Sequence, residues 1–203
     1  IIACCLTKEG MEKIQDKVSL VVLCDVTKEA DVENLIHKTS AYCKESGCKV
    51  WAIINNAGVA AGGALDWCAL KTYKFVFEVN LFGVISVTKS FLPLLKANKN
   101  SRIINMCSLA GMFSGPNMGA YCASKHALEG FAKGLRAELK PWDIHVCNVN
   151  PGYMRTPILS SGRQNGEKEF YSAPTSIQEQ YDVKQILAAN TDIHIEVSRG
   201  WCI

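Results

Sequence analysis

The sequence predicts an α/β domain with a doubly wound parallel sheet. Short apolar segments recur along the chain, and segments with helical periodicity or helix-capping residues separate them. The apolar segments do not alternate cleanly with polar residues, which is typical of parallel strands covered on both faces by helices. The segments predicted as buried strands are Ile1–Leu6, Val18–Cys24, Val50–Ile54, Arg102–Cys107 and His145–Val149.

Helix signals occupy the intervals between these strands. Thr7 and Thr27 can each act as an N-cap, Gly47 can end the second helix, and Pro141 prevents the last helix from continuing. The expected helices are Thr7–Asp16, Thr27–Gly47, Leu70–Ala97 and Tyr121–Leu139. The third of these is expected to bury an apolar face that includes Phe75, Val79, Phe82 and Leu92.

The alternation of strand and helix signals weakens beyond Thr156. Ser160–Lys168 is polar and contains glycine, so we expect a mobile loop there, whereas Ser176–Ala189 favours a helix. Ile193–Ile203 is compatible with a strand or with a frayed tail. We therefore treat residues 1–203 as one domain, with a core over 1–156 and a substrate loop and C-terminal segment over 157–203.

Composition excludes several classes of function. The 203 residues are 48% hydrophobic and 20% charged, as expected of a globular protein. The net charge is only +3 and no basic run carries interleaved aromatics, which argues against nucleic-acid binding. No run approaches the length of about 18 apolar residues that a membrane span needs. The ten cysteines form no C-x-x-C pair and no metal-ligand pattern, so we expect reduced thiols and no metal site.

Small and polar residues follow the predicted strands. Asp25 follows the second strand, Asn55–Gly58 the third, Ser108 the fourth and Asn150–Gly152 the fifth. In an open parallel sheet, ligands bind outside the carboxyl ends of the strands. Turns favour these residue types in any case, but their recurrence at successive strand ends predicts a shared cofactor crevice.

Tyr121 and Lys125 are one helical turn apart and therefore share a helix face. An ammonium beside a phenol favours phenolate and moves the phenol pKa from about 10 towards working pH. The pair therefore suits proton transfer. The alternative is an ordinary helix with an exposed lysine and a half-buried tyrosine.

Four ordered motifs together resemble those of the short-chain dehydrogenase/reductase family, from the first residue to about Thr156. The similar positions are Asn55–Gly58 (N-N-A-G), Asn80 (the helix asparagine), Ser108, Tyr121 and Lys125 (the serine and Y-x-x-x-K), and Pro151, Gly152 and Thr156 (P-G-x-x-x-T). Finer features resemble the branch of retinol dehydrogenases, hydroxysteroid dehydrogenases and the mitochondrial hydroxybutyrate enzyme. These features include Asp25-Val26-Thr27 and Trp51. The implied fold is Rossmann-like.

The resemblance implies hydride transfer between a nicotinamide cofactor and a hydrophobic, retinoid- or steroid-like alcohol or ketone. Tyr121 would be the general acid/base, and Ser108 would hydrogen-bond the substrate oxygen. Lys125 would bind the nicotinamide ribose and lower the tyrosine pKa, while Asn80 would hold a water of the proton relay. The remaining cofactor-binding residues implied are Asp25, which would contact the adenine, Val26, Asn56, Ala57, Gly58, Pro151, Gly152 and Thr156.

The sequence departs from the family in its phosphate-binding element. The chain has no T-G-x-x-x-G-x-G turn and begins at what resembles the family's second strand. One β-α unit of roughly thirty residues is absent, so the strands at Ile1–Leu6 and Val50–Ile54 are expected to have unpaired edges. We therefore expect a fragment that binds its cofactor weakly. Cys5-Leu6 is neither acidic nor basic, so NAD is favoured by the branch alone and NADP stays open.

A second hypothesis is a non-catalytic binding or regulatory protein that retains the scaffold, and a third is an epimerase or dehydratase that shares Y-x-x-x-K. The short chain and the N-N-A-G motif count against the third.

The expected partner is a small hydrophobic alcohol or ketone, with a homo-oligomer left open. The family suggests association with the endoplasmic reticulum membrane, through a segment not present here, or otherwise a cytoplasmic protein. Met112, Phe113 and Met154 are candidates to line the substrate site.

Overall fold

The computed structural model describes residues 1–154 and 156–182. The chain divides into two compact units. The first unit comprises Ile1–Ala57, Glu78–Met106 and Gly130–Asn148, and the second comprises Gly58–Phe77, Cys107–Glu129 and Val149–Ile203.

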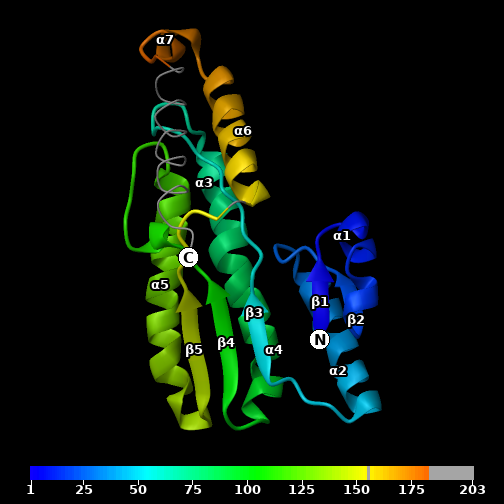
Figure 1. Ribbon diagram of the computed structural model, residues 1–203. Coiled ribbons are helices and arrows are strands. Elements are labelled where there is room, and N and C mark those ends of the chain that lie inside the picture. Colours follow the sequence, from blue (N-terminus) through cyan, green and yellow to red (C-terminus); the bar gives the residue numbers. More distant parts are fainter. Residues whose placement is uncertain (155, 183–203) are drawn as a thin grey trace. The chain divides into compact units, whose positions relative to one another are not determined.

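All five predicted strands are present, with boundaries shifted by one or two residues (Figure 1). β1 (Ile2–Cys5) pairs in parallel with β2 (Leu20–Leu23). β3 (Ala52–Asn55), β4 (Ser101–Met106) and β5 (Ile144–Val149) form a second sheet in the order β3-β4-β5. β3 and β4 are parallel. The predicted α/β class with parallel sheets and flanking helices is therefore confirmed.

β1 and β3 each lie at the edge of their own sheet. Across the described part of the chain, β1 is hydrogen-bonded only to β2, and β3 only to β4. The unpaired edges expected from the sequence are thus present. Each edge presents backbone N–H and C=O groups that a further strand could satisfy.

The main core of the first unit lies between the strands and the helices α2 (Glu29–Ser46), α4 (Gly83–Lys96) and α5 (Gly119–Leu139). Its buried members are Val22, Cys24, Val32, Leu35, Ile53, Phe91, Leu95, Ile103, Ala132, Leu135, Leu139, Ile144 and Val146. Strand and helix residues distant in the sequence therefore share a single apolar cluster.

The sheet of β3, β4 and β5 does not have the two covered faces that the sequence suggested. On β5, Ile144 and Val146 are buried, whereas His145, Cys147 and Val149 are exposed. Ile54 of β3 is 63% exposed. Apolar residues occupy both faces of these strands, but the burial pattern shows that the described helices cover only one of them.

The long helix predicted over Leu70–Ala97 forms three segments: α3 (Leu70–Phe77), a π-helical turn (Glu78–Phe82) and α4. Phe75 and Phe82, predicted to be buried, are 50% and 51% exposed. The buried face runs instead through Val76, Asn80, Val84, Thr88, Phe91 and Leu95. A π-turn shifts the side-chain phase of a helix, so simple helical periodicity misplaces this face.

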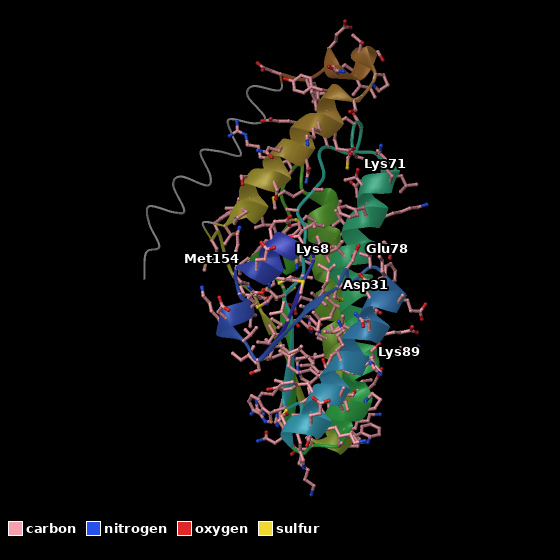
Figure 2. All side chains as sticks on the ribbon, turned by 90° about the vertical axis from the view of Figure 1, so that its right-hand side faces the viewer. Lys8, Asp31, Lys71, Glu78, Lys89 and Met154 are labelled. Atoms are coloured by element: carbon pink, nitrogen blue, oxygen red, sulfur yellow. The ribbon has the colours of Figure 1, made fainter. Side chains whose placement is uncertain are left out.

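Leu70–Lys96 is long and apolar enough to cross a membrane by length and composition, contrary to the expectation that no segment is. Phe91 and Leu95 belong to the buried core, however, and Thr88 is buried as well. Lys71 and Lys89 are exposed along the same stretch (Figure 2). The stretch therefore acts as a core helix of this fold.

The predicted helix ends are correct in part. Thr7 caps α1 (Lys8–Glu12) by accepting a hydrogen bond from the Gly10 amide at 3.1 Å, although α1 ends before Asp16. Thr27 does not cap α2, because its hydroxyl donates to Asp25 Oδ1 at 2.7 Å and Lys28 occupies the N-cap position. Gly47 ends α2 with a left-handed backbone, φ 66°, as expected.

The loop expected at Ser160–Lys168 is wrong, because these residues lie in α6 (Pro157–Tyr171). The two glycines that suggested a loop allow close packing: a Cβ at Gly162 would lie 3.0 Å from Ala60 Cβ, and one at Gly166 would lie 3.1 Å from the Gly62 carbonyl oxygen. Of the helix predicted over Ser176–Ala189, α7 (Thr175–Gln178) forms the described part. Residues 183–189 and Ile193–Ile203 lie outside the described residues.

Candidate active site

Ser108 is held at the point where β4 and β5 end together. The Cys107 amide donates to the Val149 carbonyl at 2.9 Å, and the Leu109 amide donates to the Pro151 carbonyl at 3.1 Å. Ser108 itself is extended and caps a 3₁₀ turn over Leu109–Gly111, its hydroxyl accepting from the Ala110 amide at 3.1 Å. Both neighbours of Ser108 are therefore fixed by the adjacent chain, which restricts where its hydroxyl can point.

The 3₁₀ turn after Ser108 packs closely on α5. Cys107 Sγ lies 3.4 Å from the Lys125 carbonyl oxygen and donates to it. A Cβ at Gly111 would lie 3.0 Å from that same carbonyl oxygen and 3.1 Å from Cys107 Sγ. A larger residue at position 111 would force the turn away from α5. The local packing therefore brings Ser108 to the face of α5 that carries the predicted pair.

Tyr121 and Lys125 lie on α5 as their spacing predicted. The Lys125 ammonium is 5.8 Å from the centroid of the Tyr121 ring. The Ser108 side chain lies close enough to the Tyr121 phenol to lower its pKa. All three residues belong to the second unit. The structure thus brings together the three groups that the sequence singled out for proton transfer.

Burial dominates the electrostatics of this group. It raises the pKa of Tyr121, and the hydrogen bond from Ser108 only partly opposes that effect. Lys125 is 3% exposed, and burial lowers its pKa. The expected lowering of the tyrosine pKa by the lysine is therefore wrong in direction for this geometry. Desolvation of the phenolate outweighs its hydrogen bond.

The loop after β5 contributes a buried acceptor. Asn150 Oδ1 has no hydrogen-bond partner within the described residues, while Asn150 Nδ2 lies 3.7 Å from Met112 Sδ. Gly152 lies against Leu109, where a Cβ would be 3.4 Å from Leu109 Cδ1. A buried acceptor of this kind suits a ligand that carries a hydroxyl or an amide group.

Thr156 occupies the N-cap position of α6 and is exposed. Its amide donates to the Met154 carbonyl at 2.8 Å, and Pro157 follows at the first helical position. The P-G-x-x-x-T segment therefore connects the end of β5 to α6. Gly58, another predicted cofactor-binding residue, also belongs to the second unit.

The other predicted site residues lie in the first unit. Asn80 is fully buried within the π-helical turn, a feature that is frequent at functional sites. Asn56 and Ala57 are exposed immediately after β3. Val26 packs against Gly83 at the start of α4. Asn56 and Ala57 thus follow a strand directly, whereas Asn80 lies inside the π-helical turn.

Asp25 is already engaged within its own turn. Its carboxylate accepts from the Thr27 amide at 3.0 Å and from the Thr27 hydroxyl at 2.7 Å, and these bonds hold the pKa of Asp25 below its usual range. Its amide donates to the carboxylate of Asp31 (Figure 2) at 2.9 Å. Asp25 therefore organises the turn after β2, in addition to its predicted role at the cofactor.

A buried amide ladder, which the sequence analysis missed, joins the ends of three strands. Asn55 Nδ2 donates to Asn105 Oδ1 at 2.9 Å, and Asn105 Nδ2 donates to Asn148 Oδ1 at 3.0 Å. Asn55 Nδ2 also lies 3.1 Å from the Thr88 hydroxyl. The ladder ties β3, β4 and β5 together just before their functional ends. The available signal was an asparagine near the end of each of three successive apolar strands.

A second feature missed by the sequence analysis anchors α6. The Glu169 carboxylate accepts from the Ala69 amide at 2.9 Å and from the Thr72 hydroxyl at 2.6 Å, at the start of α3. Beside it, Trp67 packs edge-on against Phe170 with ring centroids 5.2 Å apart. Two hydrogen bonds and an aromatic contact thus hold α6 against a segment about a hundred residues earlier in the sequence.

The candidate substrate-lining residues are exposed. Met112 is 59%, Phe113 69% and Met154 60% exposed, and Figure 2 marks Met154. Met112 and Phe113 follow the 3₁₀ turn after Ser108, and Met154 lies just before α6. The second unit therefore presents exposed apolar side chains on the segment that follows Ser108 and on the segment between β5 and α6.

Residues 2–167 match the family model for short chain dehydrogenases. An oxidoreductase of Bacillus subtilis, YusZ, is 36% identical over 86% of this chain and 59% of its own length. Retinol dehydrogenase 16 of Mus musculus is 32% identical over 92% of this chain and 59% of its own. A 3beta-hydroxysteroid dehydrogenase of Caenorhabditis elegans is 27% identical over 100% of this chain and 57% of its own. The chain thus spans little more than half the length of these curated relatives.

Solved structures show the same similarity. A short chain dehydrogenase/reductase from Burkholderia phymatum in complex with NAD superimposes with a TM-score of 0.75, at 25% identity, over 100% of this chain and 71% of that one. A 3-ketoacyl-(acyl-carrier-protein) reductase from Brucella melitensis complexed with NADH gives a TM-score of 0.72, at 27% identity, over 81% of this chain and 69% of that one.

Proposed function

The chain belongs to the short-chain dehydrogenase family, and we propose that it transfers a hydride between a nicotinamide cofactor and a hydrophobic alcohol or ketone. The observation that carries the proposal is the meeting of Ser108, Tyr121 and the buried Lys125, with the Ser108 side chain close enough to lower the pKa of the Tyr121 phenol. These polar groups fit the nicotinamide-ribose half of such a cofactor, because the buried Lys125 ammonium can donate to sugar hydroxyls and the buried Asn150 Oδ1 can accept from an amide.

Tyr121 is the general acid/base of this reaction. Its raised pKa keeps the phenol protonated near neutral pH, so it can donate a proton to the oxygen of a ketone. In the reverse direction the alcohol passes its proton to the Tyr121 phenolate, which the Ser108 hydroxyl stabilises. When bound, the nicotinamide supplies or accepts the hydride at the carbinol carbon.

Ser108 and Lys125 position the reactants. The Ser108 hydroxyl lies against the phenol and can donate to the same substrate oxygen, which stabilises charge that develops there. Lys125 binds the ribose hydroxyls from its buried position on α5. Asn80 serves the proton relay, and Asp25, Val26, Asn56, Ala57, Gly58, Pro151, Gly152 and Thr156 complete the cofactor site of the proposal.

We favour NAD as the cofactor and a retinoid- or steroid-like compound as the substrate. NAD and NADH are named in the two solved structures above. Retinol and 3beta-hydroxysteroid dehydrogenases are among the relatives. The exposed side chains of Met112, Phe113 and Met154 suit an apolar substrate.

The alternative is a non-catalytic protein that keeps the scaffold. This alternative requires a protein without the T-G-x-x-x-G-x-G turn that cradles the pyrophosphate, and residues 1–203 contain no such turn. Intact Ser108, Tyr121 and Lys125 favour the enzyme, because a scaffold has no use for this combination.

The substitution Tyr121→Phe tests the proposal. Turnover of retinol and of a hydroxysteroid with NAD should fall by roughly 10²–10⁴-fold, the usual contribution of a positioned acid/base. Tyr171→Phe is the matched control, because Tyr171 is 67% exposed on α6. It should leave turnover unchanged. Equal activity of both variants would refute the role of Tyr121, and inactivity of the unaltered protein towards every alcohol would favour the scaffold.

A further inference from the structure

Two thiols meet at the C-terminal end of α2. Cys43 lies in the last turns of the helix, and Gly47 then reverses the chain with a left-handed backbone. This reversal brings Cys48 back towards the helix, so that the two sulfur atoms are 3.5 Å apart. Residues with a side chain rarely adopt this backbone conformation, so the glycine at position 47 allows the turn that brings the two sulfur atoms together.

The two thiols have different surroundings. Cys48 is exposed, and hydrogen bonds from the Ser46 hydroxyl, 3.0 Å away, and from the Cys43 thiol lower its pKa. Cys43 is half-buried, and burial raises its pKa. The Ser46 hydroxyl has a single proton and also lies 2.7 Å from the Tyr42 carbonyl oxygen. It therefore donates to Cys48 only when that proton is directed away from the Tyr42 oxygen. Cys48 is therefore the nucleophile and Cys43 the proton-bearing partner.

We propose that Cys43 and Cys48 form a redox modification site, in which a hydroperoxide converts the neighbouring thiols into a reversible disulfide. The inference is independent of the proposed dehydrogenase activity. Closing the bond requires the sulfurs to approach from 3.5 Å to about 2.05 Å. The exposed chain after Ser46 can accommodate a movement of that size.

The reaction has two balanced steps. The Cys48 thiolate attacks one oxygen of hydrogen peroxide, the O–O bond breaks, and Cys48 becomes a sulfenic acid as hydroxide takes up a proton to give water. The Cys43 sulfur then attacks the Cys48 sulfur, the S–O bond breaks, and a second water leaves with the proton of Cys43. The two cysteines lose two electrons and the peroxide gains them. A small thiol restores the dithiol by exchange.

Other cysteines provide a contrast within the same chain. Burial raises the pKa of Cys24 to about 12 and that of Cys107 to about 11, so both remain thiols at neutral pH. Cys147 is exposed on β5, with no hydrogen bond to a second thiol in the described part of the chain. Thiolate character and a neighbouring thiol thus coincide at Cys48.

Peptide mapping tests the site directly. Trypsin cleaves after Lys38, Lys44 and Lys49, which places the two cysteines on separate peptides, 39–44 and 45–49. After brief exposure to hydrogen peroxide and alkylation of the remaining thiols, we expect these peptides to be joined, with a mass two hydrogens below their sum. Dithiothreitol should separate them. A joined peptide that contains any other cysteine instead would overturn the proposal.

Substitutions assign the two roles. Cys48→Ser and Cys43→Ser should both abolish the joined peptide, whereas Cys147→Ser should leave it intact. In Cys43→Ser, dimedone should trap a sulfenic acid on Cys48. Ser46→Ala should slow alkylation of Cys48 by roughly threefold to tenfold, because the thiolate loses a hydrogen bond. An unlabelled Cys48 in Cys43→Ser, or an unchanged alkylation rate in Ser46→Ala, would contradict the assignment.

Discussion

Lys125 carries an ammonium group on a residue that is only 3% exposed. Burial lowers its pKa below the ordinary value of 10.5, so the folded protein holds this proton less tightly than the unfolded chain does. A buried charge of this kind reduces stability, and proteins often retain one where function requires it. Lys125 fits that description beside Tyr121.

We expect Lys125→Met to raise the free energy of unfolding at neutral pH while it reduces turnover. The folded pKa lies below the unfolded pKa, so the cost of the charge is present below the folded pKa. That cost disappears as pH rises through the folded pKa towards 10.5. The advantage of the variant should therefore be largest near neutral pH and shrink at alkaline pH. Urea unfolding across this pH range measures it.

Lys133→Met is the matched control, because Lys133 is exposed on the same helix. It should change neither the turnover nor the pH dependence of stability. A large loss of stability in Lys125→Met at neutral pH would mean that the partners of the ammonium outweigh its desolvation, contrary to this account.

At the residue scale, spacing predicted which groups meet but not their energetics. The Tyr121–Lys125 spacing on a helix predicted that pair, and the resemblance to the family added Ser108 to it. The pKa of Tyr121 was predicted in the wrong direction, because desolvation depends on packing that spacing does not reveal. The amide ladder was missed for a related reason: Asn55, Asn105 and Asn148 become partners only through the pairing of three strands.

At the scale of elements, glycine occurs both in loops and at close helix contacts, and its presence alone does not distinguish the two. Gly162 and Gly166 suggested a loop, yet they lie four apart on one face of α6 and permit its close approach to Ala60 and Gly62. In the same way, the π-turn at Glu78–Phe82 changes the buried face of the long helix. The strands were predictable because each is a short apolar run bounded by turn or helix-capping residues.

The anchor between α6 and α3 gives a prediction at this scale. Glu169→Ala removes the acceptor of the Ala69 amide and of the Thr72 hydroxyl, leaving two part-buried donors without their partner. We expect the free energy of unfolding to fall by about 1–3 kcal/mol. Chemical denaturation monitored by circular dichroism measures the loss.

Glu167→Ala provides the comparison on the same helix. Glu167 pairs with Arg163 at 3.2 Å, four residues away, and the arginine side chain is 51% exposed. Such surface pairs contribute little, so the expected change is within about 0.5 kcal/mol. Equal effects of the two substitutions would show that Glu169 is not an anchor.

For the whole molecule, the unpaired edges of β1 and β3 are the main structural consequence of the strand order. The two sheets of the first unit share one apolar cluster, although no described strand joins them. The family's phosphate-binding turn would follow a strand, and no such turn occurs in residues 1–203. Residues 1–203 therefore carry the proposed catalytic cluster of Ser108, Tyr121 and Lys125 but no glycine-rich turn of this kind.

We accordingly expect residues 1–203 to bind NAD and NADP weakly. The lost contacts are the amides of a glycine-rich turn at a helix N-terminus, which bind phosphate through hydrogen bonds and the helix dipole. Isothermal titration calorimetry with each cofactor measures the affinity. Submicromolar binding by residues 1–203 would contradict the expectation and show that other residues hold the pyrophosphate.

The central claim is that Tyr121 and Ser108 move a proton at a substrate oxygen while hydride passes to a nicotinamide. A secondary alcohol deuterated at the carbinol carbon tests it, with mass spectrometry of the reduced cofactor as the readout. We predict that the deuterium appears in the reduced nicotinamide with the unaltered protein, and that Tyr121→Phe greatly slows its appearance. Reduced cofactor without deuterium, or transfer at an undiminished rate in Tyr121→Phe, would contradict the claim.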